Sequence, residues 1–404
     1  MTQDEKLDRL AEIAVKIGVN VQKGQELIVN APIDARALVQ RIVAHAYDAG
    51  ATLVVPLFVD DVVQRARFVH ADEESFDFAP AWLYEAMAKS LGDGAAVLTI
   101  VGSDPMLLAG CDQARIGRAQ RATAAAMKPV RNLISSFSTN WSILSFATPG
   151  WAASVFPDEP RDAAVAKLWD AIFAVSRVDQ PDPVRAWRDH AATLGRRCDV
   201  LNDKRFAALR FRGPGTDLRV GLAEDHRWAG GSVESRNGTV CLPNMPTEEV
   251  FTMPHKMKVE GVVSATKPLV NGGALIEGIW VRFEAGRIVE AQASKGQDVF
   301  RALIGTDEGA ARLGEVALVP EVSPVAQSGL IFRNTLFDEN AACHIALGQA
   351  LSLNMEGGCD AARGANESLI HVDWMIGSGQ VDVDGITASG AVEPVMRAGA
   401  FTLG

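Results

Sequence analysis

Ala95–Val101 (AAVLTIV) is a short run that is apolar except for Thr99, and this type of segment decides the fold of the first half of the chain. Such a run is typical of a strand buried on both faces of a parallel sheet. Glu26–Asn30 and Thr52–Val59 are similar runs, and Ser142–Phe146 is another expected strand. Segments with helical character precede and separate these strands: Glu5–Ile17 comes before the first strand, and Arg36–Ala49, Ala79–Leu91 and Gln113–Met127 lie between strands. The alternation predicts an α/β domain in which helices cover a parallel sheet.

The pattern changes after a proline-containing connection at Val178–Arg185. A helix is expected to follow through Leu194, and then come short strand candidates joined by glycine-containing turns. These candidates are Ala207–Phe211, Leu218–Gly221, Gly261–Ser264, Ile279–Phe283 and Ile288–Ala291. We therefore predict a boundary near residue 185, with an N-terminal α/β domain over 1–185 and an α+β domain with antiparallel hairpins over 186–404.

Composition limits the class of protein. The chain has 404 residues, of which 48% are apolar and 22% charged, as expected for a globular protein with a substantial core. Its net charge of −11 and the lack of a basic run argue against a nucleic-acid partner. No secretory signal and no run of about 18 apolar residues is present, so no membrane partner is expected. The five cysteines are widely spaced, which favours reduced thiols and a cytoplasmic protein.

The segment His371–Val372–Asp373–Trp374 lies in an apolar stretch of strand type. Residues i and i+2 of a strand point to the same face, so His371 and Asp373 should project together. An imidazole and a carboxylate on one face are suited to binding a metal ion. The alternative is a surface histidine beside a surface aspartate.

His344 lies within the segment Asn334–Leu351, in which we predict a helix that has Asp338 as its N-cap and Glu339 in its first turn and runs through His344. The surrounding residues are small and apolar, so this helix should pack closely. A core histidine bonded to a backbone carbonyl is the alternative to a metal ligand.

Two further segments place acids in apolar surroundings. Glu248 and Glu249 occur in NMPTEEVF, and Glu315 follows a glycine in LGEVAL. Burying carboxylates is costly unless a cation compensates their charge. The alternative is that these acids are not buried and face water, the Glu248–Glu249 pair at a turn and Glu315 at a strand edge. With one acid of the Glu248–Glu249 pair counted, the segments together supply three carboxylates and two imidazoles, a set that suits two divalent cations with a bridging water.

NMPTEEVF, LGEVAL, LFDENAACHIALG and HVDWMIGS, in this order, resemble the signatures of the M29 family of metalloaminopeptidases. The resemblance is strongest over about 244–377. It implies a hydrolase that removes N-terminal residues from peptides, two divalent metal ions per chain (cobalt, zinc, manganese or magnesium), and a homodimer. Carried over to this chain, the metal ligands are Glu249, Glu315, His344, His371 and Asp373. Glu249 is preferred to Glu248 because its spacing to Glu315 (315 − 249 = 66) matches the family.

One position departs from the family pattern. The family carries a catalytic tyrosine seven residues after the histidine, whereas this chain has Leu351, which on the expected helix would face the same way as His344. Loss of an oxyanion donor can cost about 10²–10³ in rate. Glu248 is the predicted catalytic residue, which passes a proton to the leaving amine. Two alternatives remain: a mononuclear iron ring-cleaving dioxygenase using both histidines and one carboxylate, and a binding protein that lost catalysis.

Overall fold

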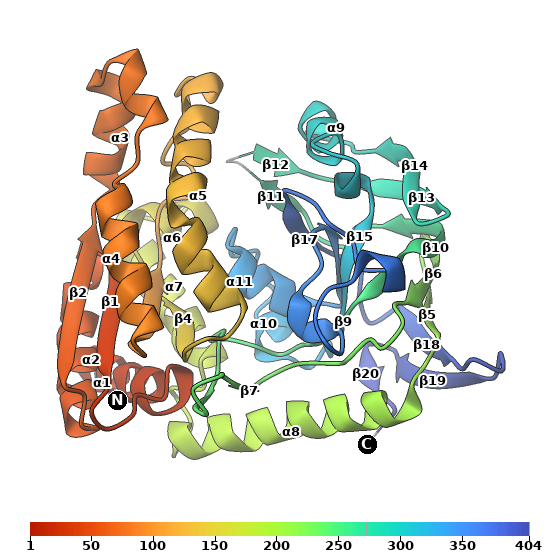
Figure 1. The fold of residues 1–404 in the computed structure, drawn as a ribbon, viewed down its shortest axis with the longest axis horizontal. Helices are drawn as coiled ribbons and strands as arrows, with labels where there is room; N and C mark the ends of the chain where they lie inside the picture. The colour runs from red at the N-terminus through yellow and green to blue at the C-terminus, as the bar shows by residue number, and fades with distance from the viewer. Residues whose placement is uncertain (272–273, 404) are drawn as a thin grey trace. The chain divides into compact units, whose positions relative to one another are not determined.

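The computed structural model describes residues 1–271 and 274–403, which fall into two compact units (Figure 1). Unit 1 comprises Met1–Asp189 and Ser232–Pro246. Unit 2 comprises His190–Gly231 and the chain from Thr247 onward. The helix α8 (Pro183–Lys204) runs from the first into the second.

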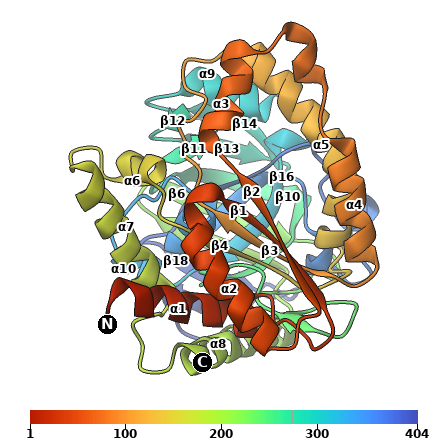
Figure 2. The same ribbon diagram turned by 90° about the vertical axis from the view of Figure 1, so that its left-hand side faces the viewer.

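Unit 1 is built on a parallel sheet with the strand order β2-β1-β3-β4. These strands are β1 (Glu26–Pro32), β2 (Leu53–Val59), β3 (Ala96–Val101) and β4 (Trp141–Ser145). The helices are α1 (Gln3–Ile13), α2 (Arg36–Asp48), α3 (Asp61–His70), α4 (Ala81–Gly92), α5 (Gln113–Ser135), α6 (Pro149–Val155) and α7 (Arg161–Val175), and a short pair β7 (Val233–Glu234) and β8 (Val240–Cys241) completes the unit. Figure 2 looks onto this unit, where α1 packs against α2 and α2 packs against β1 and β2. The predicted α/β arrangement is confirmed.

The N-terminal sheet forms because its strands bury apolar side chains between helices. Ile28 of β1 and Val97 of β3 pack with Met87 and Leu91 of α4 and Val130 of α5. The edge strand β2 differs, since Leu53, Phe58 and Val59 are between 41% and 49% exposed. The neighbouring α3 buries none of its residues. Unit 1 therefore carries an uncovered apolar edge.

Unit 2 contains an antiparallel sheet in the order β14-β13-β10-β6-β5-β18-β19-β20. The strands are β5 (Ala208–Gly213), β6 (Thr216–Leu222), β10 (Pro254–Ser264), β13 (Trp280–Glu284), β14 (Arg287–Gln292), β18 (Asp382–Ile386), β19 (Val392–Arg397) and β20 (Ala400–Phe401). A hairpin of β11 (Leu269–Asn271) and β12 (Ala274–Ile276) and the helices α9 (Gln297–Ile304), α10 (Pro324–Gln327) and α11 (Thr335–Asp338) accompany it. The predicted α+β character of this half is confirmed.

A smaller sheet in unit 2 carries the conspicuous polar residues of the sequence. Its order is β17-β16-β15-β9, and every neighbouring pair is antiparallel. The strands are β9 (Val250–Thr252), β15 (Leu313–Leu318), β16 (His344–Gly348) and β17 (His371–Met375). Val316, Ile345 and Trp374 from its three longer strands join the main apolar core of the unit. One face of the small sheet therefore packs against the apolar core of unit 2.

The prediction of a helix that starts at Asp338 and runs through His344 is wrong. α11 ends at Asp338, a single turn (η5, Glu339–Ala341) follows, and His344 opens the strand β16. Asn334, rather than Asp338, caps α11. The carboxylate of Asp338 instead accepts hydrogen bonds from the backbone N–H groups of Phe332 and Asn334. Pairing with β15 and β17 determines this segment, and tertiary context overrides the helical propensity of its alanines and leucines.

All five cysteines are free, as expected. Among the residues that the structure describes, no helix is both long and apolar enough to cross a bilayer.

Candidate metal centre

The predicted ligands meet on one face of the small sheet. Opposite residues on antiparallel strands share a face. Glu315 lies opposite Ala346, which in turn lies opposite Asp373. His344 lies in the next row, between Ala317 and Met375. This face is the reverse of the one that carries Val316, Ile345 and Trp374, so period-2 alternation separates the polar site from the core. Ala317 and Ala346 are small neighbours that leave space beside the ligands.

Glu315 lies at the centre of two groups of ligand atoms. Glu249, Glu315 and His344 form one group, and Glu315, His371 and Asp373 form the other; the atoms of each group lie within 4.8 Å of one another. Its two oxygens face different histidines: Oε1 is 3.5 Å from His344 Nε2, and Oε2 is 3.7 Å from His371 Nε2. A carboxylate in this position is suited to bridging two cations.

The outer ligands complete each group. Glu249 Oε2 lies 3.1 Å from His344 Nε2, and Asp373 Oδ1 lies 3.4 Å from His371 Nε2. His371 and Asp373 are two residues apart on β17, so the prediction that they project together is confirmed by the strand geometry. The structure therefore brings all five predicted ligands together.

Both imidazoles are oriented by backbone carbonyls. His371 Nδ1 donates to Gln349 O at 2.7 Å, and His344 Nδ1 donates to Ala342 O at 3.2 Å. A proton held on Nδ1 leaves Nε2 as the metal-binding nitrogen, and in both residues Nε2 points toward the carboxylates. The backbone bond that we listed as the alternative to metal binding for His344 therefore serves to orient a ligand.

Gly314 explains how Glu315 reaches this face. The ladder between β15 and β16 shifts register between Leu313 and Glu315. A Cβ at position 314 would lie 2.4 Å from the carbonyl oxygens of Gly348 and Gln349. Only a glycine permits this close approach, which also positions the Gln349 carbonyl that orients His371.

The chemistry of the donor set fits divalent cations. Glu249 Oε2 and Asp373 Oδ1 are buried and have no hydrogen-bond partner within the described chain. Burial raises the pKa of Glu315. Burial lowers the pKa of His371, but the negative charges of Asp373 and Glu315 outweigh this effect and raise that pKa to about 10. Buried carboxylates that lack donors are costly unless cations compensate them, so the set matches oxygen-rich sites for such ions.

Glu248, the predicted catalytic residue, belongs to neither group. Its carboxylate lies 3.4 Å from Nε2 of His190, a nitrogen that also contacts Thr247 O at 2.8 Å. Its backbone N–H donates to Asn340 Oδ1 at 2.6 Å. Asn340 thereby positions the segment that presents Glu249.

Glu339 is a site residue that the sequence reasoning missed. It precedes β16 by a few residues, and burial together with the negative charges of Glu249 and Asp373 raises its pKa well above the ordinary value. It was assigned to the first turn of an expected helix, where an acid needs no further explanation. The available signal was a second acid in the same DENAACH segment as His344.

Leu351 is not placed as expected. β16 ends at Gly348, and Leu351 is the N-cap of a short turn, η6 (Ser352–Asn354). The argument that it faces the same way as His344 by helical periodicity is therefore wrong.

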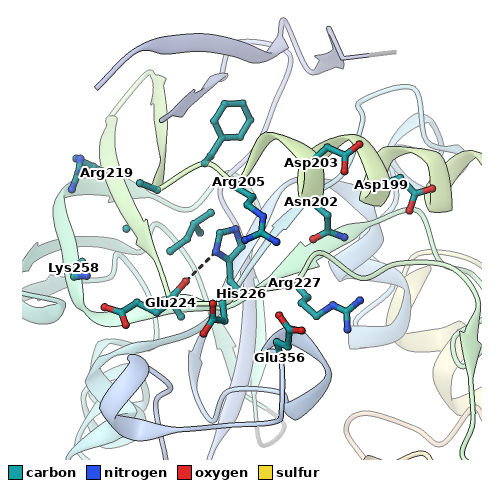
Figure 3. A pocket seen from close by; sticks show the side chains of 16 residues that line it. Asp199, Asn202, Asp203, Arg205, Arg219, Glu224, His226, Arg227, Lys258 and Glu356 are labelled. Atoms are coloured by element: carbon teal, nitrogen blue, oxygen red, sulfur yellow. Dashed lines mark hydrogen bonds between the residues drawn. The ribbon is translucent and has the colours of Figure 1, made fainter. Parts of the chain in front are cut away.

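A cavity of about 880 Å³ lies elsewhere in unit 2 (Figure 3). Its lining includes Arg205, His226, Lys258 and Glu356 and contains none of the five predicted ligands. His226 Nδ1 donates to Ala223 O at 3.0 Å. Its volume therefore carries no information about the ligand cluster.

Comparison with known proteins gives consistent results. Residues 3–401 match the family model described as thermophilic metalloprotease (M29). The chain is 51% identical to "Aminopeptidase T" of Thermus aquaticus over 99% of both chains, and 45% identical to "Aminopeptidase AmpS" of Bacillus subtilis over 98% of both. The solved structure of wild-type AmpT from Thermus thermophilus has a TM-score of 0.95 at 52% identity, covering 98% of this chain and 99% of that one.

A more distant structural relative shares the fold alone. 2,5-Dihydroxypyridine dioxygenase from Pseudomonas putida has a TM-score of 0.52 at 12% identity, over 100% of this chain and 99% of that one.

Proposed function

Because the chain belongs to the thermophilic metalloprotease (M29) family and is therefore a hydrolase, we propose that it is an aminopeptidase that works through two divalent metal ions. The observation that supports two ions is the position of Glu315, whose two oxygens face two different ligand groups. The aminopeptidases named among its relatives support the substrate class, which is peptides with a free N-terminus.

We propose Glu249, Glu315 and His344 as the residues that hold one cation, and Glu315, His371 and Asp373 as those that hold the other. Cobalt, zinc, manganese or magnesium would serve. Cations held by these residues would supply Lewis-acid chemistry: they would polarise the scissile carbonyl and lower the pKa of a bound water. Gln349 and Ala342 keep both histidines in the required tautomer through their carbonyls. The buried sheet face excludes bulk water and strengthens these electrostatic interactions.

The group that passes a proton to the leaving amine stays a prediction. Glu248 was predicted for this role, and its carboxylate lies beside a second titratable group, the imidazole of His190. Glu248→Gln should lower kcat by 10²-fold or more while leaving metal content unchanged, because general acid–base groups contribute about 10²–10⁴. An unchanged kcat would remove Glu248 from the mechanism.

The dioxygenase alternative is not favoured. A single iron needs two histidines and one carboxylate, whereas this face presents two groups with three carboxylates. The dioxygenase likeness, at 12% identity, extends to the fold only. Leu351 in place of the family tyrosine is the one feature that supports the binding-protein alternative, and turnover would exclude it.

We also propose a cytoplasmic homodimer and the domain division 1–185 and 186–404. The uncovered apolar edge of unit 1 supports self-association, since Leu53, Phe58 and Val59 on β2 are followed by Val62 and Val63, which are 77% and 68% exposed. Sedimentation velocity tests the dimer: a single species at twice the chain mass is expected, and a monomer at micromolar concentration would refute it.

The deciding experiment is release of p-nitroaniline from leucine p-nitroanilide by metal-stripped protein titrated with Co²⁺. We expect activity that saturates near two equivalents. Saturation at one equivalent would refute the two-metal proposal, and inactivity with all four metals across several aminoacyl substrates would refute the peptidase assignment.

A further inference from the structure

Asp307 lies outside both groups of ligand atoms, and its carboxylate joins two segments that lead into them. It follows α9 and precedes the short turn η4 (Gly309–Ala311), from which the chain enters β15. Within its own segment, Asp307 Oδ1 accepts a hydrogen bond from the backbone N–H of Ala310 at 2.9 Å. From the segment before β17, the N–H of Leu369 donates to Oδ2 at 2.7 Å, and Ser368 Oγ donates to the same carboxylate, 2.8 Å from Oδ1 and 3.0 Å from Oδ2.

The two strands that follow these segments do not pair with each other, because β16 lies between β15 and β17 in the sheet. Both are antiparallel to β16, so they start at the same end of the sheet, beside Gly348, where β16 ends. β15 supplies Glu315, and β17 supplies His371 and Asp373. Asp307 therefore connects the starts of the two strands that together supply one ligand group.

The same network reaches the imidazole of His371. The backbone N–H of Ser368 donates to Gln349 Oε1 at 3.1 Å, and the N–H of Gln349 donates to Ile370 O at 2.7 Å. The carbonyl of Gln349 accepts the hydrogen bond from His371 Nδ1 that leaves Nε2 for the metal. The segment that Asp307 holds is thus bonded to the residue that orients His371.

The outer ligands of the other group lie at the opposite end of the sheet. His344 is the first residue of β16, and Glu249 directly precedes β9. Both strands are antiparallel to β15, so they start where β15 ends, away from the segments that Asp307 connects. Glu315, which the two groups share, is held by the pairing of β15 with both β9 and β16.

The hydrogen bonds favour an ionised Asp307. Burial raises the pKa of its carboxyl, but the bonds from Leu369, Ser368 and Ala310 outweigh burial and hold the pKa below the ordinary 3.8. Hydrogen bonds to an ionised group are roughly twice as strong as those between neutral groups. Each of these partners is a donor, so an amide at position 307 would direct its NH₂ group at another donor.

We propose that Asp307 is a positioning residue that holds the group of Glu315, His371 and Asp373 in its metal-binding arrangement, and that the group containing His344 does not depend on it. The proposal rests on the two-ion aminopeptidase function proposed above. Loss of a group that orients a metal ligand typically lowers metal affinity about 10- to 100-fold. Removing the carboxylate of Asp307 should therefore weaken one of the two ions and leave the other.

The test is calorimetric titration of the metal-free protein with Co²⁺. Asp307→Asn should bind one equivalent within about threefold of the wild-type affinity and the other about 10- to 100-fold more weakly. Ser368→Ala should show a smaller loss in the same direction, and Ser368→Thr, which keeps the hydroxyl, should bind both ions as the wild type does. To assign the weakened ion, Asp307→Asn is combined with His371→Ala. The added change should leave the affinity for the remaining ion unaltered, because the group that it positions is already lost.

Excess metal provides a second readout, because Asp307→Asn leaves every ligand in place. Half-maximal activity should need about 10- to 100-fold more Co²⁺ than in the wild type, whereas kcat at saturating Co²⁺ should approach the wild-type value. Glu308→Gln is the matched control, since it removes the exposed carboxylate of the next residue. Its affinities for both ions should equal those of the wild type.

Two results would overturn the inference. Asp307→Asn could bind both equivalents as tightly as Glu308→Gln, or it could bind both more weakly by the same factor, which would indicate a general loss of folding. Failure of the proposed function is a different result, in which the wild type itself binds one equivalent or none, or cleaves no peptide.

Discussion

Gly314→Ala should weaken metal binding although position 314 supplies no ligand atom. The new Cβ would lie 2.4 Å from the Gly348 and Gln349 carbonyl oxygens, and real Cβ contacts essentially never fall under 3.0 Å. β15 and β16 must therefore separate locally by at least 0.6 Å (3.0 − 2.4). Metal–ligand distances tolerate about 0.2 Å. The displacement moves Glu315 directly and His371 through its bond to Gln349 O.

We expect Co²⁺ affinity to fall about 10- to 100-fold, as when a group that orients a ligand is lost. Overpacking should also lower the free energy of unfolding of the metal-free protein by about 1–3 kcal/mol. Calorimetric titration and urea unfolding measure the two effects. Gly379→Ala is the control, because a Cβ there meets no atom within 4 Å. If Gly314→Ala binds Co²⁺ as tightly as Gly379→Ala, the claim that this close approach positions the site is refuted.

Three further predictions concern the rest of unit 2. Burial opposes ionisation of Asp384, but ion pairs with Arg397 and Arg212 hold the pKa of its carboxyl below the ordinary 3.8. The ionised carboxylate therefore stabilises the folded protein fully above about pH 4, and this stabilisation is lost as the pH falls through the lowered pKa. Asp384→Asn should lower the free energy of unfolding at pH 7 by about 1–3 kcal/mol and flatten its dependence below pH 4; an unchanged acid slope in urea titrations would contradict this. Burial raises the pKa of Cys343 to about 11 and that of Cys198 to about 12. In the native protein at pH 8, iodoacetamide should therefore alkylate neither thiol, as measured by mass spectrometry, and labelling at the rate of free cysteine would refute this expectation. Trp374→Ala removes a fully buried ring packed edge-on against Phe300 and should cost about 3–5 kcal/mol in urea unfolding, a loss under 1 kcal/mol being inconsistent with this packing.

The strands of the parallel sheet were predictable because short, largely apolar runs such as Ala95–Val101, when they alternate with helical segments, usually form buried strands. The pairing of His371 with Asp373 was predictable for a similar reason, since period-2 geometry acts over two residues. Both inferences needed local information alone.

His344 shows where local information fails. Asp338 and Glu339, which suit the N-terminus of a helix, precede the alanines and leucines around His344, and these are good helix formers. The strand forms instead because β15 and β17 flank it and satisfy its backbone groups. The glycine at position 348 was the signal in the sequence that the strand ends there. In the structure Gly348 has a φ of +102°, and a Cβ at this position would lie 2.1 Å from Ile370 O. The position of Glu339 beside the ligand cluster was hidden by the same error.

The two faces of the small sheet separate folding of the chain from metal binding. The apolar face can drive the strands together without any ion, as Val316, Ile345 and Trp374 pack into the core. The polar face is complete only when β17 has joined β16, and β17 is the last of the four strands of this sheet along the chain. An emerging polypeptide therefore offers no finished coordination sphere until β17 has been synthesised. Cations would be captured by an already folded protein, so a cell short of metal would accumulate a folded apoenzyme that a later supply of metal could activate.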